Sequence, residues 1–243
     1  MSKRRWWIIG LLFLSTVINY IDRQTLSILA RTIQNEMHLT DLDYSHVVQL
    51  FLLAYTIAYL LAGRITDWLG TRTAMATFIV WWSIADILTG FAKSVGQLGL
   101  CRFLLGLGEP GNYTAAPKAI SEWFTAKENS LALGLYTAGA TVGATLAPPV
   151  IATLTAHYGW RSSFYFTGIL GLIWVIPWWF TYRSPEQKKE APARPVRVSE
   201  WQRWKSLLGE RETWLLMLIR MFTDPVWYFY LFWFPKYLSD ARQ

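Results

Sequence analysis

Cysteine and histidine are scarce in this chain of 243 residues. The single cysteine, Cys101, excludes an internal disulfide framework and any cysteine-based metal cluster, because both need several thiols. The three histidines, His38, His46 and His157, are scattered and suggest no metal site. The sequence also lacks the HExxH, G-x-S-x-G and Walker patterns, so it predicts neither an enzyme nor an ATP-driven pump, and no bound cofactor.

Charged residues are also few, at 16% of the chain, whereas soluble domains have about 25%. The hydrophobic residues, 53% of the total, occur in blocks that approach the roughly 20 residues needed to cross a bilayer. Most of these blocks lack the polar stripe of a soluble core helix. The sequence therefore predicts an all-α polytopic membrane protein in contact with the lipid bilayer. The expected spanning helices are residues 6–30, 45–63, 74–92, 96–117, 129–154, 162–182 and 213–237.

The basic residues indicate membrane topology and not a nucleic-acid partner. The net charge is +7, but the lysines and arginines form no dense patch with stacking aromatic residues. They are instead enriched in alternate connections between the expected helices, and many of the 15 tryptophans stand at the ends of apolar blocks. By the positive-inside rule we expect a multi-pass protein of the inner or plasma membrane with a cytoplasmic N-terminus.

A change in composition near residue 183 predicts the domain organisation. Three prolines occur in residues 184–195 among glutamate, lysine, glutamine and alanine, as in a flexible linker. We expect an N-terminal bundle of six transmembrane helices in residues 1–182, a basic cytoplasmic linker in residues 183–212, and a seventh transmembrane helix in residues 213–243. This arrangement suggests a fragment of a larger membrane protein, whose further helices would be partners of this chain.

The first expected helix carries polar and charged residues within an apolar block. Asn19, Asp22 and Arg23 stand at positions i, i+3 and i+4, and therefore share one helix face. Ionisable groups within the membrane are costly and normally face a cavity or a partner, which marks Asp22 and Arg23 as candidate functional residues. The alternative is that Asp22 lies at a helix end and reaches water.

The fourth apolar block contains a second pair of charges. Arg102 and Glu109 stand seven residues apart, two turns or about 10 Å along one helix face. This spacing suggests a charge relay, and the alternative is a structural ion pair between helices one and four, which would not exclude a function. The glycines at 106, 108 and 111 allow a neighbouring helix to approach closely.

Two motifs in the same block are coincidental matches. Residues 106–111 fit the G-x-G-x-x-G dinucleotide pattern, but no strand precedes them and no βαβ unit surrounds them. Asn112, Tyr113 and Thr114 fit a glycosylation sequon, but they lie within or beside a spanning helix, where a glycan has no room.

Two further groups of residues lie outside the first and fourth expected helices. The short connection from Gly63 to Arg72, with Asp67 and Gly70, can cap helix ends and pair with a neighbouring bundle, or it can be an ordinary positive-inside turn. In the seventh expected helix, Arg220 precedes Asp224 by four residues, and a proline follows at once. This arginine could meet an anionic ligand, and the alternative is an ion pair within the helix.

Four segments together resemble a known family. The segment Gly63 to Arg72 resembles the signature between helices two and three of the major facilitator superfamily, although Trp68 stands where a basic residue is usual. Residues 19–27 and 102–124 are similar to the first-helix and fourth-helix motifs of its anion:cation symporter family. Residues 223–236 look like the seventh helix of the hexuronate-transporter branch.

The resemblance implies the major facilitator superfamily fold, with about twelve helices in two six-helix halves around a midplane site, and transport by alternating access. It implies proton-titrating roles for Asp22 and Glu109, and roles for Arg23 and Arg102 in pairing with them or in attracting a substrate carboxylate. The remaining implied site residues are Tyr20, Tyr55 and Arg220 in the substrate pocket, and Gly63, Asp67, Gly70 and Arg72 in the conformational motif.

These observations favour a secondary active transporter that couples a proton to a small organic anion, most simply a hexuronate or an aldonate. Helix five departs from the hexuronate type, because residues 136–141 carry fewer amide and hydroxyl groups than that type has. This difference argues for a pocket that suits a different anion. The alternatives are a facilitator of drugs or other anions and a truncated membrane protein that does not transport. Paired arginines argue against cationic drugs, since like charges repel.

Overall fold

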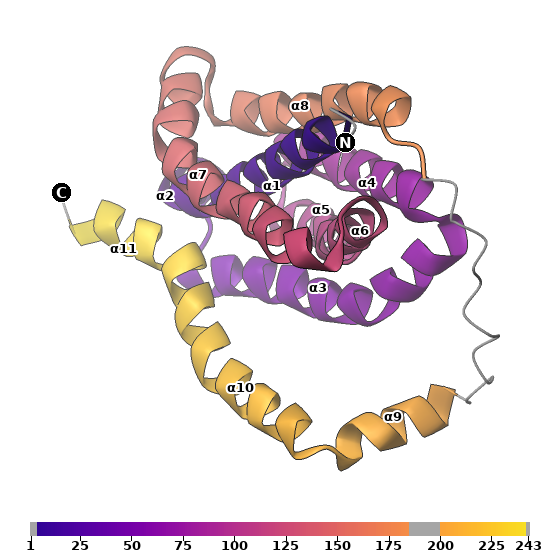
Figure 1. Cartoon of the computed structure of the whole chain (residues 1–243). Coiled ribbons are helices and arrows are strands. Elements are labelled where there is room, and N and C mark those ends of the chain that lie inside the picture. Colours follow the sequence, from indigo (N-terminus) through magenta and orange to yellow (C-terminus); the bar gives the residue numbers. More distant parts are fainter. Residues whose placement is uncertain (1–3, 185–199, 242–243) are drawn as a thin grey trace. The chain divides into compact units, whose positions relative to one another are not determined.

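The computed structural model describes residues 4–184 and 200–241, and every regular element in these ranges is an α-helix (Figure 1). The chain divides into two compact units, Met1–Pro185 and Glu186–Gln243, which are described separately below. The helices of the first unit are α1 (Arg4–Ile28), α2 (Ala30–Met37), α3 (Asp41–Leu69), α4 (Thr71–Gly90), α5 (Val95–Gly108), α6 (Pro110–Trp123), α7 (Ala126–Tyr158) and α8 (Trp160–Thr181).

The first unit is a bundle in which α1 packs on α7, α4 on α8, and α3 on α5. Helices α5 and α6 continue one another through a break at Glu109, and together they contact α3 and α4 (Figure 1). The predicted spans therefore correspond to helices, but the fourth is two shorter helices in sequence. All-helical architecture is expected here, because a helix satisfies its own backbone hydrogen bonds within a bilayer.

Five of the described helices are long and apolar enough to cross a membrane: α3, α4, α7, α8 and α10 (Arg211–Phe232). Helix α1 has 25 residues but carries Asp22 and Arg23, and α5 and α6 have 14 residues each. The predicted spans that miss this criterion are thus the ones that carry Asp22, Arg23, Arg102 and Glu109.

The ends of α3 correct the sequence prediction. A capping box at Thr40 and Asp43 starts the helix, and the helix continues past Gly63 to Leu69. The predicted connection from Gly63 to Arg72 is therefore not a loop. Polar residues extend the helix beyond its apolar run, and only Gly70, with φ of 75°, separates α3 from α4. A left-handed backbone at this point favours glycine.

Polar contacts join helices at both ends of the bundle. At one end, the Thr71 hydroxyl donates to Glu122 at 2.6 Å and the Tyr182 hydroxyl donates to the same carboxylate at 2.5 Å, which joins α4 and α6 to the end of α8. At the other end, Glu36 of α2 accepts a bond from Trp160 Nε1 at 2.7 Å and pairs with Arg161. The bonds from Arg161 and Trp160 hold the pKa of Glu36 below its usual range.

The second unit contains α9 (Glu200–Gly209), α10 and α11 (Phe234–Ala241). Helix α10 exposes large apolar side chains around most of its circumference and buries only Leu231 and Phe232 within the described structure. A helix with this distribution belongs in lipid or against further helices.

The close contact between α1 and α7 gives a first prediction. A Cβ atom on Gly143 would lie 2.6 Å from the Val17 carbonyl oxygen, whereas one on Gly134 would meet nothing within 4 Å. We expect Gly143→Ala to destabilise the folded bundle by about 1–3 kcal/mol, because α1 must move away from the added methyl group. Thermal unfolding of the detergent-purified product of the complete gene measures this loss.

Gly134→Ala is the matched control, because it adds the same methyl group to the same helix in open space. Equal melting temperatures for the two variants would show that α1 and α7 do not depend on close backbone approach.

Candidate functional site

The break between α5 and α6 positions the candidate site. Pro110 has no backbone N–H, so the helical hydrogen-bond ladder is interrupted next to Glu109. Small residues around the break let α4 approach: a Cβ atom on Gly108 would lie 2.7 Å from the Trp81 ring, and one on Gly111 would overlap Phe78. As a result the Glu109 side chain is fully buried between helices.

Glu109 forms an ion pair with Arg23 of α1. Arg23 Nε donates to Glu109 Oε2 at 2.8 Å, and Nη2 donates to the same oxygen. The exposed fractions of the two side chains are 4% and 0%, so the pair is shielded from water. This is the predicted alternative of an ion pair between helices one and four. Arg102 and Glu109 form no such pair.

Aromatic rings surround the Arg23 guanidinium. Its Cζ lies 4.9 Å from the Tyr55 ring centroid, 5.7 Å from Tyr20, and 5.8 Å from both Phe51 and Tyr113. Cation–π attraction at such distances stabilises a cation that has left water. The two predicted pocket tyrosines, Tyr20 and Tyr55, are thus placed beside Arg23, and Tyr113 joins them.

The second arginine has a partner that sequence reasoning missed. Arg102 Nη2 lies 3.4 Å from Asp86 Oδ1 on α4, and the Thr167 hydroxyl of α8 donates to Asp86 Oδ2 at 2.5 Å. Asp86 is fully buried. The signal that could have revealed it was an acidic residue in the middle of the apolar block 74–92, which is costly there unless it has a partner.

Asp22 differs from the other two buried carboxylates. It has no exposed surface, and neither of its side-chain oxygens makes a well-formed hydrogen bond within the part of the chain that the structure describes, although the Thr167 hydroxyl lies near enough to interact with it. The alternative in which Asp22 reaches water is therefore wrong for this structure. Asp86, Glu109 and Arg102 all lie close enough to act on Asp22 electrostatically.

We call Asp22, Arg23, Asp86, Arg102 and Glu109 the charge cluster. It combines three carboxylates with two guanidinium groups, and Arg102 Nε has no hydrogen-bond partner among the described residues. When every carboxylate is ionised, the cluster carries one uncompensated negative charge. A single proton on one carboxyl makes it neutral, which is the favourable state for buried groups.

Asn112 organises the neighbouring polar contacts. Ser15 donates to its Oδ1 at 3.0 Å, its Nδ2 donates to Thr16 at 3.3 Å, and the Tyr136 hydroxyl donates to its backbone oxygen at 3.1 Å. These bonds join α1, α6 and α7 beside the charge cluster. Asn112 has no exposed surface, which agrees with the rejection of the glycosylation sequon.

The residues of the conformational motif contact neighbouring helices. Lys118 Nζ of α6 lies 2.5 Å from Asp67 Oδ1, and Arg72 donates to the backbone oxygen of Trp179 while its Cζ lies 4.3 Å from that ring. Gly63 lies inside α3, and Gly70 forms the turn. The charged members thus connect the α3–α4 turn to α6 and α8.

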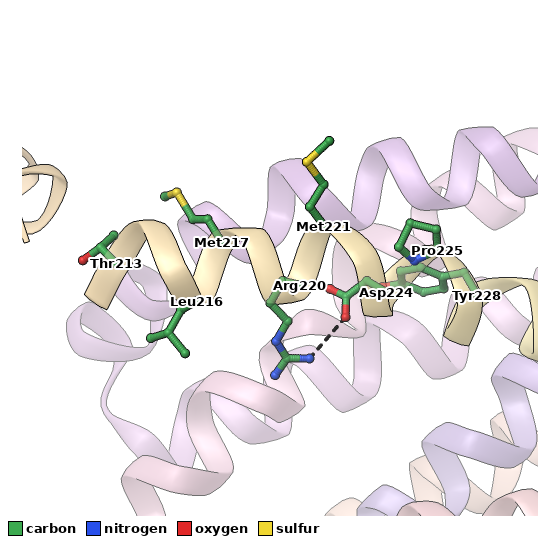
Figure 2. Close-up of a pocket in the computed structure, with 8 residues that line it drawn as sticks. All are labelled: Thr213, Leu216, Met217, Arg220, Met221, Asp224, Pro225 and Tyr228. Carbon is green, nitrogen blue, oxygen red and sulfur yellow. Dashed lines mark hydrogen bonds and ion pairs between the residues drawn. The ribbon is translucent and has the colours of Figure 1, made fainter. Parts of the chain in front are cut away.

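Arg220 lies in the second unit and pairs within its own helix. Its Nη1 is 3.3 Å from Asp224 Oδ1, four residues later, and its side chain is 76% exposed (Figure 2). This is the predicted alternative of an intrahelical pair. A role of Arg220 in the substrate pocket stays a prediction. The two residues face a groove along α10 whose other lining residues are Thr213, Leu216, Met217, Met221, Pro225 and Tyr228.

Comparison with known proteins identifies the family. The pattern of the Major Facilitator Superfamily matches residues 12–242. The chain belongs to this superfamily. It is therefore an integral membrane protein, and the resemblance seen in its motifs is confirmed.

Similar superfamily proteins include a galacturonate transporter of Dickeya chrysanthemi, 31% identical over 98% of this chain and 72% of its own length. A hexuronate transporter of Escherichia coli K12 is 30% identical, over 96% of this chain and 57% of its length. A D-galactonate transporter of Escherichia coli O6:H1 is 26% identical, over 99% and 61%. The chain thus spans between half and three quarters of these relatives.

Among solved structures, the chain is similar to an inward-facing, unoccupied bacterial homologue of the human lysosomal transporter Spinster. The TM-score is 0.79 at 22% identity, over 98% of this chain and 56% of that structure. At this identity the likeness supports the fold, and the predicted superfamily fold is confirmed.

The buried Arg23–Glu109 pair gives a second prediction. Arg23→Gln leaves three carboxylates of the charge cluster against one guanidinium, and we expect a loss of about 3–5 kcal/mol of stability at pH 7. Thermal unfolding of the purified complete protein at pH 7 measures the effect.

Arg161→Gln is the control, because Arg161 pairs with Glu36 at the surface, where an ion pair contributes about 1 kcal/mol or less. An Arg23→Gln variant as stable as Arg161→Gln would contradict the burial of the pair.

Proposed function

We propose that this chain contributes the N-terminal bundle and a further helix to a secondary transporter that moves a small organic anion together with a proton by alternating access. We infer that the anion is a sugar acid, a hexuronate or an aldonate. Support comes from the buried charge cluster and from relatives named as transporters of galacturonate, hexuronate and D-galactonate. The proposed location is the inner or plasma membrane, with a cytoplasmic N-terminus by the positive-inside rule.

The observation that carries the proposal is the ion pair of Arg23 with Glu109, which is buried away from water in a cluster with more carboxylates than guanidinium groups. A substrate carboxylate is chemically equivalent to the Glu109 side chain and can replace it on the Arg23 guanidinium, which binds carboxylates through paired N–H donors. Glu109 is then a buried carboxylate without a counter-charge, and a proton removes the cost of that charge. Binding of the anion thereby favours binding of the proton.

The aromatic residues around Arg23 suit a polyhydroxylated substrate. Tyr55 and Tyr113 are partly exposed, and a phenol hydroxyl both donates and accepts hydrogen bonds. A sugar acid bound by its carboxylate at Arg23 would bring its hydroxyl groups to these phenols. Its C–H faces would pack on the rings. No covalent step is needed, and no enzymatic activity is proposed.

Alternating access requires contacts that break and re-form at the two ends of the bundle. We assign Asp67 and Arg72 to this role, because they join the α3–α4 turn to α6 and α8 through exposed or partly exposed groups. Exposed ion pairs contribute little stability and so can open at low cost. Arg220, on the first helix after the linker, is the proposed contribution of the second unit to the pocket.

Uptake into proteoliposomes containing the product of the complete gene tests the proposed function. We expect radiolabelled glucuronate, galacturonate or galactonate to accumulate several-fold above its equilibrium level when an inward proton gradient is imposed. Glu109→Gln should abolish this accumulation, because glutamine cannot exchange a proton. Exchange of labelled for unlabelled substrate across the membrane should continue in the variant, since exchange needs no net proton movement.

Glu36→Gln serves as the control, because it removes a carboxylate outside the charge cluster. Absence of uptake of all three anions by folded wild-type protein would contradict the assignment of a sugar acid as the substrate. Gradient-independent uptake would sink proton coupling.

A further inference from the structure

Asp86 is the member of the charge cluster with no role in the proposed exchange between substrate and Glu109. It lies on α4 and contacts Arg102 of α5 and Thr167 of α8. Its ion pair with Arg102 is long, at 3.4 Å, and uses one of the guanidinium nitrogens. The bond is therefore weaker than a two-point arginine–carboxylate pair.

Two groups near this ion pair have incomplete hydrogen bonding. Arg102 Nε is buried and has no hydrogen-bond partner among the described residues, and neither oxygen of Asp22 makes a well-formed hydrogen bond there, although the Thr167 hydroxyl lies near enough to interact with Asp22. An unmade hydrogen bond of a buried group destabilises the folded state. Arg102 and Asp22 interact electrostatically. A second arrangement, in which Arg102 turns to Asp22, would satisfy donor and acceptor together.

We propose that Asp86 is a positioning residue that competes with Asp22 for the Arg102 guanidinium and thereby sets the pH at which the empty charge cluster takes up the proton that neutralises it. The proposal rests on the proposed function as a proton-coupled transporter. In the structure described here Asp86 holds Arg102, so Asp22 has no counter-charge and is the carboxyl that a proton would neutralise.

The contacts of Asp86 suit both arrangements. When Arg102 turns to Asp22, Asp86 loses its counter-charge and keeps Thr167. The Thr167 hydroxyl donates to Asp86 Oδ2, and it also lies 3.0 Å from the Ser163 backbone oxygen. It can therefore donate to an ionised Asp86, or donate to Ser163 and accept from a protonated Asp86. One proton thus neutralises the cluster whichever carboxyl Arg102 binds.

Several titratable groups around Asp86 act on the competition between Asp86 and Asp22 for Arg102. The charged ones are Arg102 of α5, Asp22 of α1, and Glu109 at the α5–α6 break, whose charge Arg23 compensates. The uncharged titratable groups that interact with Arg102 are Cys101 of α5 and Tyr44 of α3. Asp86 bonds to Arg102 and Thr167, so its replacement is expected to leave the Arg23–Glu109 pair in place.

The test measures how gradient-driven uptake by the complete protein depends on pH in two variants with opposite expected effects. Asp86→Asn frees Arg102 to pair with Asp22, so Asp22 accepts its proton only in more acidic solution. We expect the pH of half-maximal uptake to fall by about 1–3 units. In Asp86→Glu the longer side chain closes the 3.4 Å gap to Arg102, so we expect the pH of half-maximal uptake to rise above the wild-type value.

Substrate binding is followed in parallel by the thermal stabilisation that the transported anion gives to each variant, which shows that both are folded. Wild-type pH dependence in both folded variants would overturn the role of Asp86 while leaving the proposed function intact. A wild type without gradient-stimulated uptake would overturn both. If Asp86→Asn does not fold, the direction of the Asp86→Glu shift decides alone, and an unchanged or lower value would overturn the proposal.

Discussion

The burial of Arg23 against Glu109 is the constraint on which the first unit depends. A guanidinium in a bilayer-spanning bundle is stable only where a counter-charge and aromatic faces replace water. Both are present, with Glu109 on one side and four rings within 6 Å around the group. Charges in this position cost stability, so their presence indicates a functional demand.

The backbone around the Arg23–Glu109 pair positions the two side chains to meet. Glu109 reaches Arg23 because Pro110 interrupts the helix beside it, and because glycines at 106, 108 and 111 bring α3 and α4 against the break. Larger residues would collide with Ala54, Trp82 or Phe78 and move the carboxylate away from α1. The same close approach recurs between α7 and α1 at Gly139 and Gly143, which fixes the other side of the helix that carries Arg23.

Much of the fold and part of the site were predictable from the sequence. Apolar blocks of membrane length located the helices, and Asp22, Arg23, Arg102 and Glu109 were conspicuous as charges within such blocks. The pairing was not predictable, because helical spacing gives positions along each helix but not the rotation of one helix against another. Arg102 therefore binds Asp86, an acid that spacing alone never connected with it. Likewise, α3 continues to Leu69 because its polar last turns remain helical. The sequence prediction ended the helix where the apolar run ends.

The charge balance of the cluster bears on how transport could proceed. Under the proposed function, the empty cluster is neutral with one proton, and a monovalent anion on Arg23 adds one negative charge that a second proton on Glu109 would cancel. The cluster would then be neutral in both the empty and the loaded state. A neutral site can change its exposure within a low-dielectric bundle at far lower cost than a charged one. Under the proposed function, one proton entering with each monovalent anion keeps the charge of the cluster constant, which is why the two would travel together.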